Sequence, residues 1–137
     1  MSSEGNVVDF ASTGAKGMSQ RPNITELSDE EIREVADKYW LHLIRASNDG
    51  NYGEFVRHFA REFAMAMNMV AFNHQYHNSE LARTLSEDFD FLGIIRRGEH
   101  VTVLYRQRST AKEGEWLGRL VLGFEDGRIK IFGASFF

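Results

Sequence analysis

Tyr39, His42 and His74 are the side chains of this sequence best suited to moving a proton. An imidazole changes charge near neutral pH, and a tyrosine hydroxyl is both a donor and an acceptor. Tyr39 and His42 lie three residues apart in a segment with helical spacing, so they would be neighbours on one helix. Each also has a structural interpretation, because Tyr39 suits a packed core and His42 suits the edge of an apolar stripe. Asp37, on the other flank of that segment, is expected to be solvated. The identity of any catalytic residue is therefore left open.

His74 and His77 form a second group with possible chemistry, because residues three apart share one face of a helix. Two imidazoles together with a third ligand could bind a metal ion. The sequence contains no cysteine and places no carboxylate at a metal-site spacing from these histidines. Exposed or hydrogen-bonded helix histidines are the simpler interpretation. We therefore predict no metal site and no cofactor.

Arg106 and Arg108 share one face of a predicted strand and belong to the densest group of cations in the chain. They could bind an acidic ligand or contact a partner subunit. Asp88 and Asp90 occur at the start of the preceding predicted strand, so cross-strand ion pairs are the simpler interpretation.

The composition is that of one globular domain with a substantial core. The chain has 137 residues, of which 42% are hydrophobic, and a net charge of −4. That charge gives no basic footprint for nucleic acid. No stretch approaches the roughly 20 apolar residues of a membrane span, and the first residues do not follow the pattern of a secretion signal. We therefore expect a cytoplasmic protein that has neither nucleic-acid nor membrane partners.

Two regions can be distinguished along the chain. Residues 1–23 are rich in Ser, Gly and Ala without a sustained period, which predicts a flexible N-terminal arm. Residues 24–137 contain the periodic segments and are predicted to form the folded domain.

The first helix has strong signals at both ends. Ser28 and Glu31 have the spacing of a capping box, in which each side chain bonds the backbone amide of the other residue. Apolar residues then recur at helical spacing for about five turns. Gly50 can adopt the left-handed conformation that ends a helix. The sequence therefore predicts a long amphipathic helix before Gly50.

Two further helices are expected before the sheet. Asn51 suits the N-cap of a short second helix. Residues Phe63–Met69 alternate like an extended segment, so we predict a bridge that lines the core there. A third helix is expected from about Asn68 to Leu85, with a possible break near Asn78.

The last third of the chain predicts an antiparallel meander of about four strands, because alternating segments are separated by short turn signals. The expected strands are Phe89–Arg97, His100–Ser109, Trp116–Phe124 and Ile129–Phe137. Helices followed by such a meander predict an α+β fold, with three N-terminal helices packed on the sheet.

Residues 28–137 resemble the nuclear transport factor 2-like superfamily, whose SnoaL-like and ketosteroid isomerase-like members form a cone. The resemblance lies in the order of elements, the Asn-Asp-Gly-Asn-Tyr junction after the first helix, the Phe-Leu-Gly-Ile-Ile-Arg-Arg-Gly strand and the terminal Ile-Phe-Gly-Ala-Ser-Phe-Phe. It implies a cone-shaped α+β barrel, in which a curved sheet wraps the first helix around a pocket. It also implies a homodimer formed through the sheet.

The resemblance further implies an apolar pocket that is lined by one face of the sheet and by residues of the helices. The expected lining residues are Tyr39, Trp40, Leu43, Phe55, Met65, Met67, Phe72 and Tyr76.

The superfamily contains both enzymes and non-catalytic domains, so the fold alone does not assign a reaction. Its isomerases use a tyrosine on the first helix and an aspartate after the second helix. The matching positions here are Leu43 and Met67, and no carboxylate lies between Phe63 and Glu80. This departure argues against isomerase chemistry, which needs a carboxylate near the abstracted proton.

Two functions remain as hypotheses. The first is a domain that binds a small hydrophobic ligand or acts as a dimeric interaction module. The alternative is a pocket enzyme of the cyclase, dehydratase or epoxide hydrolase type, with Tyr39, His42 or His74 as acid–base groups.

Overall fold

The computed structural model describes residues 22–137 of the chain. The arm expected over residues 1–23 therefore lies outside the described residues, except for Pro22 and Asn23. The Asn23 side chain accepts a hydrogen bond from the Thr25 amide at 2.9 Å, which begins a short 3₁₀ helix, η1, Ile24–Glu26. Ile24 is fully buried, so this short helix packs against the domain.

The long helix α1, Asp29–Asp49, has the ends that the sequence predicts. The Ser28 hydroxyl accepts from the Glu31 amide at 3.1 Å, and the Glu31 carboxylate accepts from the Ser28 amide at 2.9 Å. Gly50 ends the helix with a left-handed φ of 65°. The capping box and the glycine stop are therefore confirmed.

Four shorter helices follow α1, and three of them begin at a side-chain cap. They are α2, Tyr52–Phe55; α3, Arg61–Ala66; α4, Met69–Asn78; and α5, Glu80–Arg83. Asn51, Asn68 and Ser79 each accept a hydrogen bond from a backbone amide in the first turn of α2, α4 and α5. The predicted break near Asn78 is confirmed, because Ser79 separates α4 from α5.

The extended bridge predicted over Phe63–Met69 is wrong, and so is the expected number of three helices. Arg61–Ala66 forms the helix α3, and only Met67 and Asn68 separate it from α4. Alternation over so few residues does not distinguish a strand from a helical turn, and the two alanines of the segment favour the helix.

The sheet is open and antiparallel, with its four strands in the order β2-β3-β4-β5. The strands are β2, Asp90–Arg97; β3, His100–Gln107; β4, Trp116–Glu125; and β5, Arg128–Phe136. The predicted α+β class and the predicted meander are thus confirmed. Irregularities interrupt the pairing between Phe91 and Gly93 and between Val121 and Leu122.

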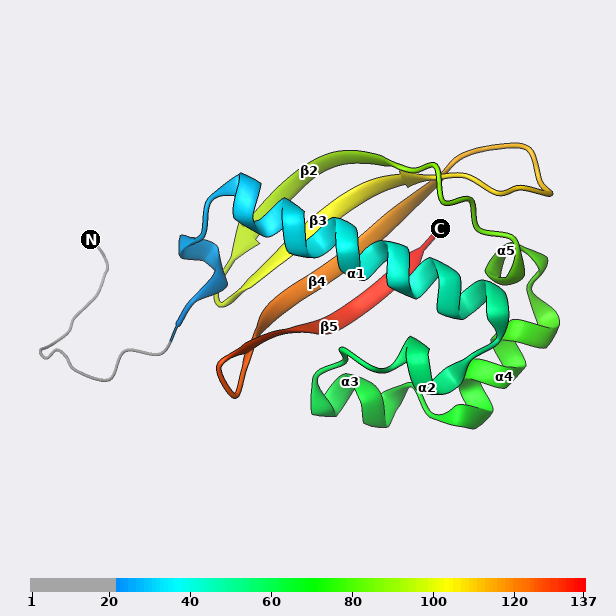
Figure 1. The fold of residues 1–137 in the computed structure, drawn as a ribbon, viewed down its shortest axis with the longest axis horizontal. Helices are drawn as coiled ribbons and strands as arrows, with labels where there is room; N and C mark the ends of the chain where they lie inside the picture. The colour runs from blue at the N-terminus through cyan, green and yellow to red at the C-terminus, as the bar shows by residue number, and fades with distance from the viewer. Residues whose placement is uncertain (1–21) are drawn as a thin grey trace, which may run out of the picture.

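Helix α1 runs across one face of the sheet; α2, α4 and α5 lie near the C-terminal end of α1, and α3 lies beside β5 (Figure 1). The strand β3 alternates between buried and half-buried residues, as expected when one sheet face packs on helices. The segment after α2 joins the edge strand β5, because the Ala60 amide donates to the Ile131 carbonyl at 2.8 Å and the Ile131 amide donates to the His58 carbonyl at 2.7 Å. Within residues 22–137, no helix is both long enough and apolar enough to cross a membrane.

Candidate functional site

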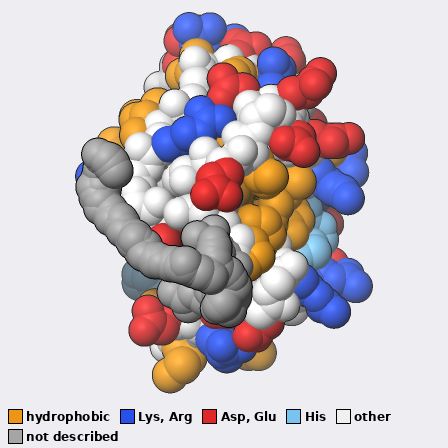
Figure 2. All heavy atoms as spheres, turned by 90° about the vertical axis from the view of Figure 1, so that its left-hand side faces the viewer, with side chains coloured by type: hydrophobic (Ala, Val, Ile, Leu, Met, Phe, Trp, Pro, Cys, Tyr) orange, Lys and Arg blue, Asp and Glu red, His pale blue; other side chains and the backbone are white. Residues whose placement is uncertain are grey.

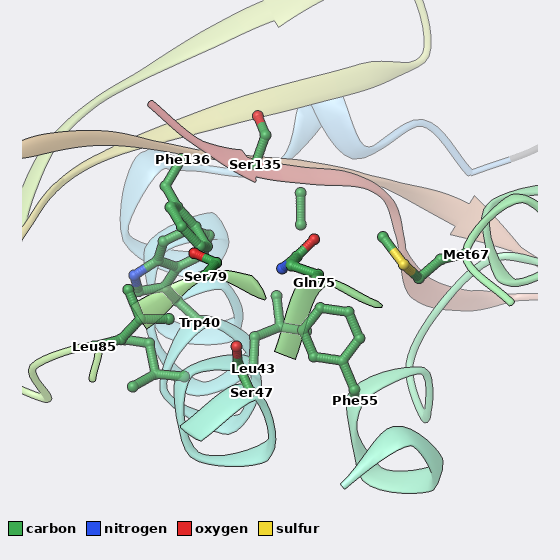
Figure 3. Close-up of a pocket in the computed structure, with 12 residues that line it drawn as sticks. Trp40, Leu43, Ser47, Phe55, Met67, Gln75, Ser79, Leu85, Ser135 and Phe136 are labelled. Atoms are coloured by element: carbon green, nitrogen blue, oxygen red, sulfur yellow. The ribbon is translucent and has the colours of Figure 1, made fainter. Parts of the chain in front are cut away.

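A partly enclosed pocket of about 190 Å³ lies between α1 and the end of β5 (Figure 3). Its remaining walls come from α2, α4 and the residues that flank α5. The lining residues are Trp40, Leu43, Ile44, Ser47, Phe55, Met67, Gln75, Ser79, Leu85, Ala134, Ser135 and Phe136. Since a cavity of about 150 Å³ can hold benzene, this pocket has room for one six-membered ring with a small substituent.

Helix α1 provides one apolar wall of the pocket. Trp40, Leu43 and Ile44 belong to its buried stripe and also line the pocket. The Trp40 indole is held at two points: its Nε1 donates to Gln107 Oε1 at 2.8 Å, and its ring stacks on Tyr105 with 5.2 Å between centroids. Because the indole is fixed by buried partners, this wall is preformed.

The serines of the pocket are engaged within the protein. Ser47 Oγ donates to the Ala82 carbonyl at 2.6 Å, and Ser79 Oγ accepts from the Ala82 amide at 3.2 Å. Ser135 Oγ accepts from Nε of Arg119 at 3.3 Å, and its hydroxyl points away from the cavity (Figure 3). The Ser47 hydroxyl joins α1 to α5, the Ser79 hydroxyl caps α5, and the Ser135 hydroxyl bonds a side chain of β4, which leaves few polar atoms for a ligand.

Gln75 is different, because its amide points into the cavity toward β5 (Figure 3). The residue is half-buried. Within residues 22–137, no group of the protein forms a hydrogen bond with this side-chain amide. A primary amide carries two donors and an acceptor, so Gln75 can present both kinds of hydrogen bond to a ligand.

The described pocket contains no acid–base group. Its lining residues within 22–137 include no Asp, Glu, His, Lys, Arg or Tyr. General acid–base catalysis needs a titratable side chain within hydrogen-bond reach of the reacting atom. The arrangement can hold and orient a small uncharged molecule, but it does not supply a proton donor or base of this kind.

Half of the residues expected in the pocket are found there. Trp40, Leu43, Phe55 and Met67 line it. Phe72 is buried behind the pocket wall, where its ring lies 4.9 Å from the ring of Phe55. Phe72 thus supports the wall from behind.

The other expected lining residues lie elsewhere. The Tyr39 hydroxyl donates to the Ile129 carbonyl at 2.8 Å, and the Tyr76 ring lies against Gly50 at the end of α1. Met65 is 79% exposed on the outer side of α3. The resemblance implied a place in the pocket for both Met65 and Met67, but successive side chains of a helix are turned by about 100°, and only Met67 lines the pocket.

The acid–base candidates on α1 belong to a separate cluster beside the pocket. The Tyr39 ring stacks on His58 at 4.4 Å, and the His42 ring meets His58 edge-on at 5.3 Å. His42 Nε2 lies 2.8 Å from the Glu54 carbonyl oxygen. Burial raises the pKa of Tyr39, while burial and the neighbouring His42 lower the pKa of His58. The contacts of Tyr39 and His42 join α1 to the segment around α2.

His74 and His77 are exposed on α4 and form no metal site with the described residues. His74 Nδ1 lies 3.3 Å from Asn78 Nδ2, and His77 meets the ring of Tyr76 edge-on at 5.4 Å. No group of three His, Asp or Glu side chains in residues 22–137 could hold a metal ion. His74 also lies outside the pocket.

Asp37 has a structural partner that the sequence did not reveal. Its carboxylate accepts a hydrogen bond from the Tyr105 hydroxyl at 2.7 Å and pairs with Arg33 at 3.2 Å. Tyr105 is fully buried, and burial raises the pKa of its phenol, with Asp37 adding to the effect. The Asp37 side chain is still 38% exposed, as a solvated residue would be, and it also satisfies the polar end of a core tyrosine.

The arginines of β3 have carboxylate partners, as the simpler interpretation of the sequence held. Arg108 Nη2 lies 2.6 Å from Asp90 Oδ2, and Arg106 Nη1 lies 3.2 Å from the same oxygen. The hydrogen bond from Arg108 lowers the pKa of Asp90. Arg106 also pairs with Glu115 at 3.3 Å. These pairs tie β2, β3 and the start of β4 together.

Sequence reasoning missed Gln75 and Ser79, although a signal for them exists. Phe72, Gln75 and Ser79 recur at spacings of three and four, so they share one face of a helix. No sequence pattern places Leu85 and Phe136 in the pocket lining, because their positions depend on where the chain after α5 and the end of β5 meet α1.

No family model and no curated protein matches the sequence. The geometry of the pocket is therefore the basis for a proposal of function.

Proposed function

We propose that the chain is a member of the nuclear transport factor 2-like superfamily, with its sheet and helices forming the cone of that fold. The order of α1, short helices and an antiparallel meander supports this proposal. The position of α1 across one sheet face agrees with it (Figure 1). The irregularities near Gly93 and Leu122 favour curvature, since bulges bend their strands.

We further propose that the pocket binds a small, uncharged, largely apolar molecule. The observation that carries this proposal is a preformed cavity with Trp40, Leu43 and Phe55 in its walls and, inside it, the side-chain amide of Gln75, which has no hydrogen-bond partner among residues 22–137. Filling such a cavity would remove apolar surface from water, at about 25 cal/mol per Å². The Gln75 amide, which points into the cavity, would then orient the ligand.

The enzyme alternative has no support at the pocket. Tyr39, His42 and His74 all lie outside it. Leu43 and Met67, which occupy the positions of the isomerase tyrosine and aspartate in the resemblance, do line the pocket, and neither side chain can donate or accept a catalytic proton. Binding without acid–base chemistry therefore accounts better for this site.

We also propose a homodimer that forms through the outer face of the sheet. Leu92 and Ile95 on β2 are 47% and 45% exposed, and an interface on this face would remove both apolar side chains from water. Native mass spectrometry of the freshly purified protein measures the subunit number and any bound compound together. A monomer at micromolar concentration would contradict the dimer and leave the pocket proposal standing.

The mixed signs of the surface charges favour partners other than nucleic acid. In the view of Figure 2, basic and acidic side chains are interspersed around a hydrophobic patch. With a net charge of −4, the chain has little of the positive field that draws in phosphate backbones.

Toluene provides a direct test of the pocket, because it matches the pocket in size and has no polar group. We expect toluene to raise the melting temperature of the wild-type protein, since a ligand at about 100 times its Kd stabilises the folded state by about 2.7 kcal/mol. The variant Ala134→Leu fills the pocket, whereas the matched variant Ala111→Leu adds the same atoms to an exposed loop.

The expected result is a shift in the wild type and in Ala111→Leu, and none in Ala134→Leu. Absence of any shift in the wild type, or an equal shift in all three proteins, would contradict binding in this pocket.

A further inference from the structure

An open hollow adjoins the pocket on the surface of α4. It is lined by Asn68, Val70, Ala71, His74, Gln75, Asn78 and Ser79. Gln75 and Ser79 line the pocket as well, so both spaces border these two residues. Gln75 therefore borders both the apolar pocket and the solvent-facing hollow.

The hollow contains hydrogen-bonding groups other than the Gln75 amide. The Asn68 side-chain oxygen Oδ1 accepts a hydrogen bond from the Ala71 amide at 2.8 Å, and the side-chain NH₂ group takes no part in that bond. The Asn78 NH₂ group donates to the His74 carbonyl at 2.8 Å, and the Asn78 side-chain oxygen takes no part in that bond. These groups, with the imidazole of His74, can bond the polar end of a molecule.

Neither space provides a fixed charge. Among the described residues that line the pocket and the hollow there is no Lys, Arg, Asp or Glu. A carboxylate or ammonium group would lose hydration there without gaining a charged partner, which disfavours charged ligands.

We infer that the pocket and the hollow form one site for an uncharged amphipathic molecule, with an apolar group no larger than one substituted ring in the pocket and a carbonyl or amide bonded to Gln75. The rest of the polar end lies in the hollow, near His74 and Asn78. This inference rests on the proposed function, because it requires that the pocket accept a ligand.

Isothermal titration with a set of related single-ring compounds tests the inference. Benzamide has a ring for the pocket and an amide that can pair with both ends of the Gln75 amide, whereas toluene has the ring alone. In the wild type we expect benzamide to bind about two- to tenfold more tightly than toluene, the range of one net hydrogen bond. Benzoate, measured at pH 8, is expected to bind more weakly than benzamide.

The variant Gln75→Met keeps the length of the side chain and removes its hydrogen bonds. We expect it to bind toluene as the wild type does and to lose the preference for benzamide. Asn73→Met is the matched control, because Asn73 is exposed on α4 and lines neither space. It should keep the preference.

N-(2-hydroxyethyl)benzamide tests the hollow, since its extension must pass Gln75 into that space. Affinity within about fivefold of benzamide is expected. A larger loss would show that the pocket closes at Gln75 and would overturn the shared site.

The outcomes separate the two proposals. If none of the single-ring compounds binds the wild type, the proposed function fails and the inference fails with it. If toluene binds but benzamide binds no better, or if Gln75→Met keeps the preference, only the inference is overturned.

Discussion

Replacing Ala134 by leucine should stabilise the protein, because it fills an existing cavity. Ala134 lies on the inner face of β5, opposite Leu120, and lines the pocket. The three added carbon atoms would contribute about 2.4 kcal/mol at about 0.8 kcal/mol per buried methylene. Ordering the leucine side chain costs roughly 0.5–1 kcal/mol. The expected net gain is about 1.5 kcal/mol, which for a chain of this length raises the melting temperature by about 5 °C.

Differential scanning calorimetry of the wild type, Ala134→Leu and Ala111→Leu measures this gain. Ala111 is exposed in the loop between β3 and β4, so the same substitution there should leave the melting temperature within about 1 °C. Overpacking a filled core typically costs about 1–3 kcal/mol. A melting temperature for Ala134→Leu several degrees below that of the wild type would therefore refute the existence of the free space.

Three further predictions concern groups outside the pocket lumen. Gln107→Leu should lower the free energy of unfolding, measured by urea denaturation, by about 2–4 kcal/mol, because the Trp40 Nε1–H and the Ser86 carbonyl each lose their hydrogen bond to Gln107. A loss below about 1 kcal/mol would contradict the role of this side-chain amide. The pKa of His58 is lower in the folded than in the unfolded protein, so its contribution to stability should be fully present above about pH 6.5 and should fall as the pH drops below that value. In the His58→Gln variant, the urea midpoint should therefore change less between about pH 7.5 and about pH 5 than in the wild type. Parallel pH profiles of the two proteins would count against this role of His58. Ser28→Ala should cost about 1 kcal/mol and Ser28→Asp much less, as measured by thermal unfolding, whereas equal losses would argue against capping.

The strands and the helix caps could be predicted because their signals are local. Alternation in His100–Gln107 depends only on which side of the strand each residue faces. The capping box at Ser28 depends on residues three apart. Such patterns fix the element and its ends before any tertiary contact forms.

The division of the helical region was harder to predict, because short helices there depend on contacts with the rest of the domain. Helix α3 has only six residues and no side-chain cap at Ala60. The segment just before it is tied to β5 by the hydrogen bonds of Ile131, which no local pattern indicates. An isolated segment of that length would not be a stable helix.

Four lining residues of the pocket, two of them on α1, were predicted, whereas the residues from α4, the chain around α5 and the end of β5 were missed. Trp40 and Leu43 follow from the apolar stripe of a helix that must face the sheet. The pairing of Asp37 with Tyr105 joins residues 68 positions apart, so a carboxylate that looks exposed in the sequence is partnered in the fold. Polar residues that complete a core or a pocket are the ones that a periodic pattern cannot identify.

Gly118 leaves room for the Trp40 indole, although it does not itself line the pocket. A Cβ atom on residue 118 would lie 2.6 Å from a ring carbon of Trp40, closer than real Cβ contacts allow, and the indole itself forms part of the pocket wall. Even one methyl group at this position would require the indole to shift, and with it part of the pocket wall. The range of molecules accepted by the domain can therefore be tuned through a residue that no ligand contacts, which makes residue 118 a natural position to vary when ligands of different size are sought.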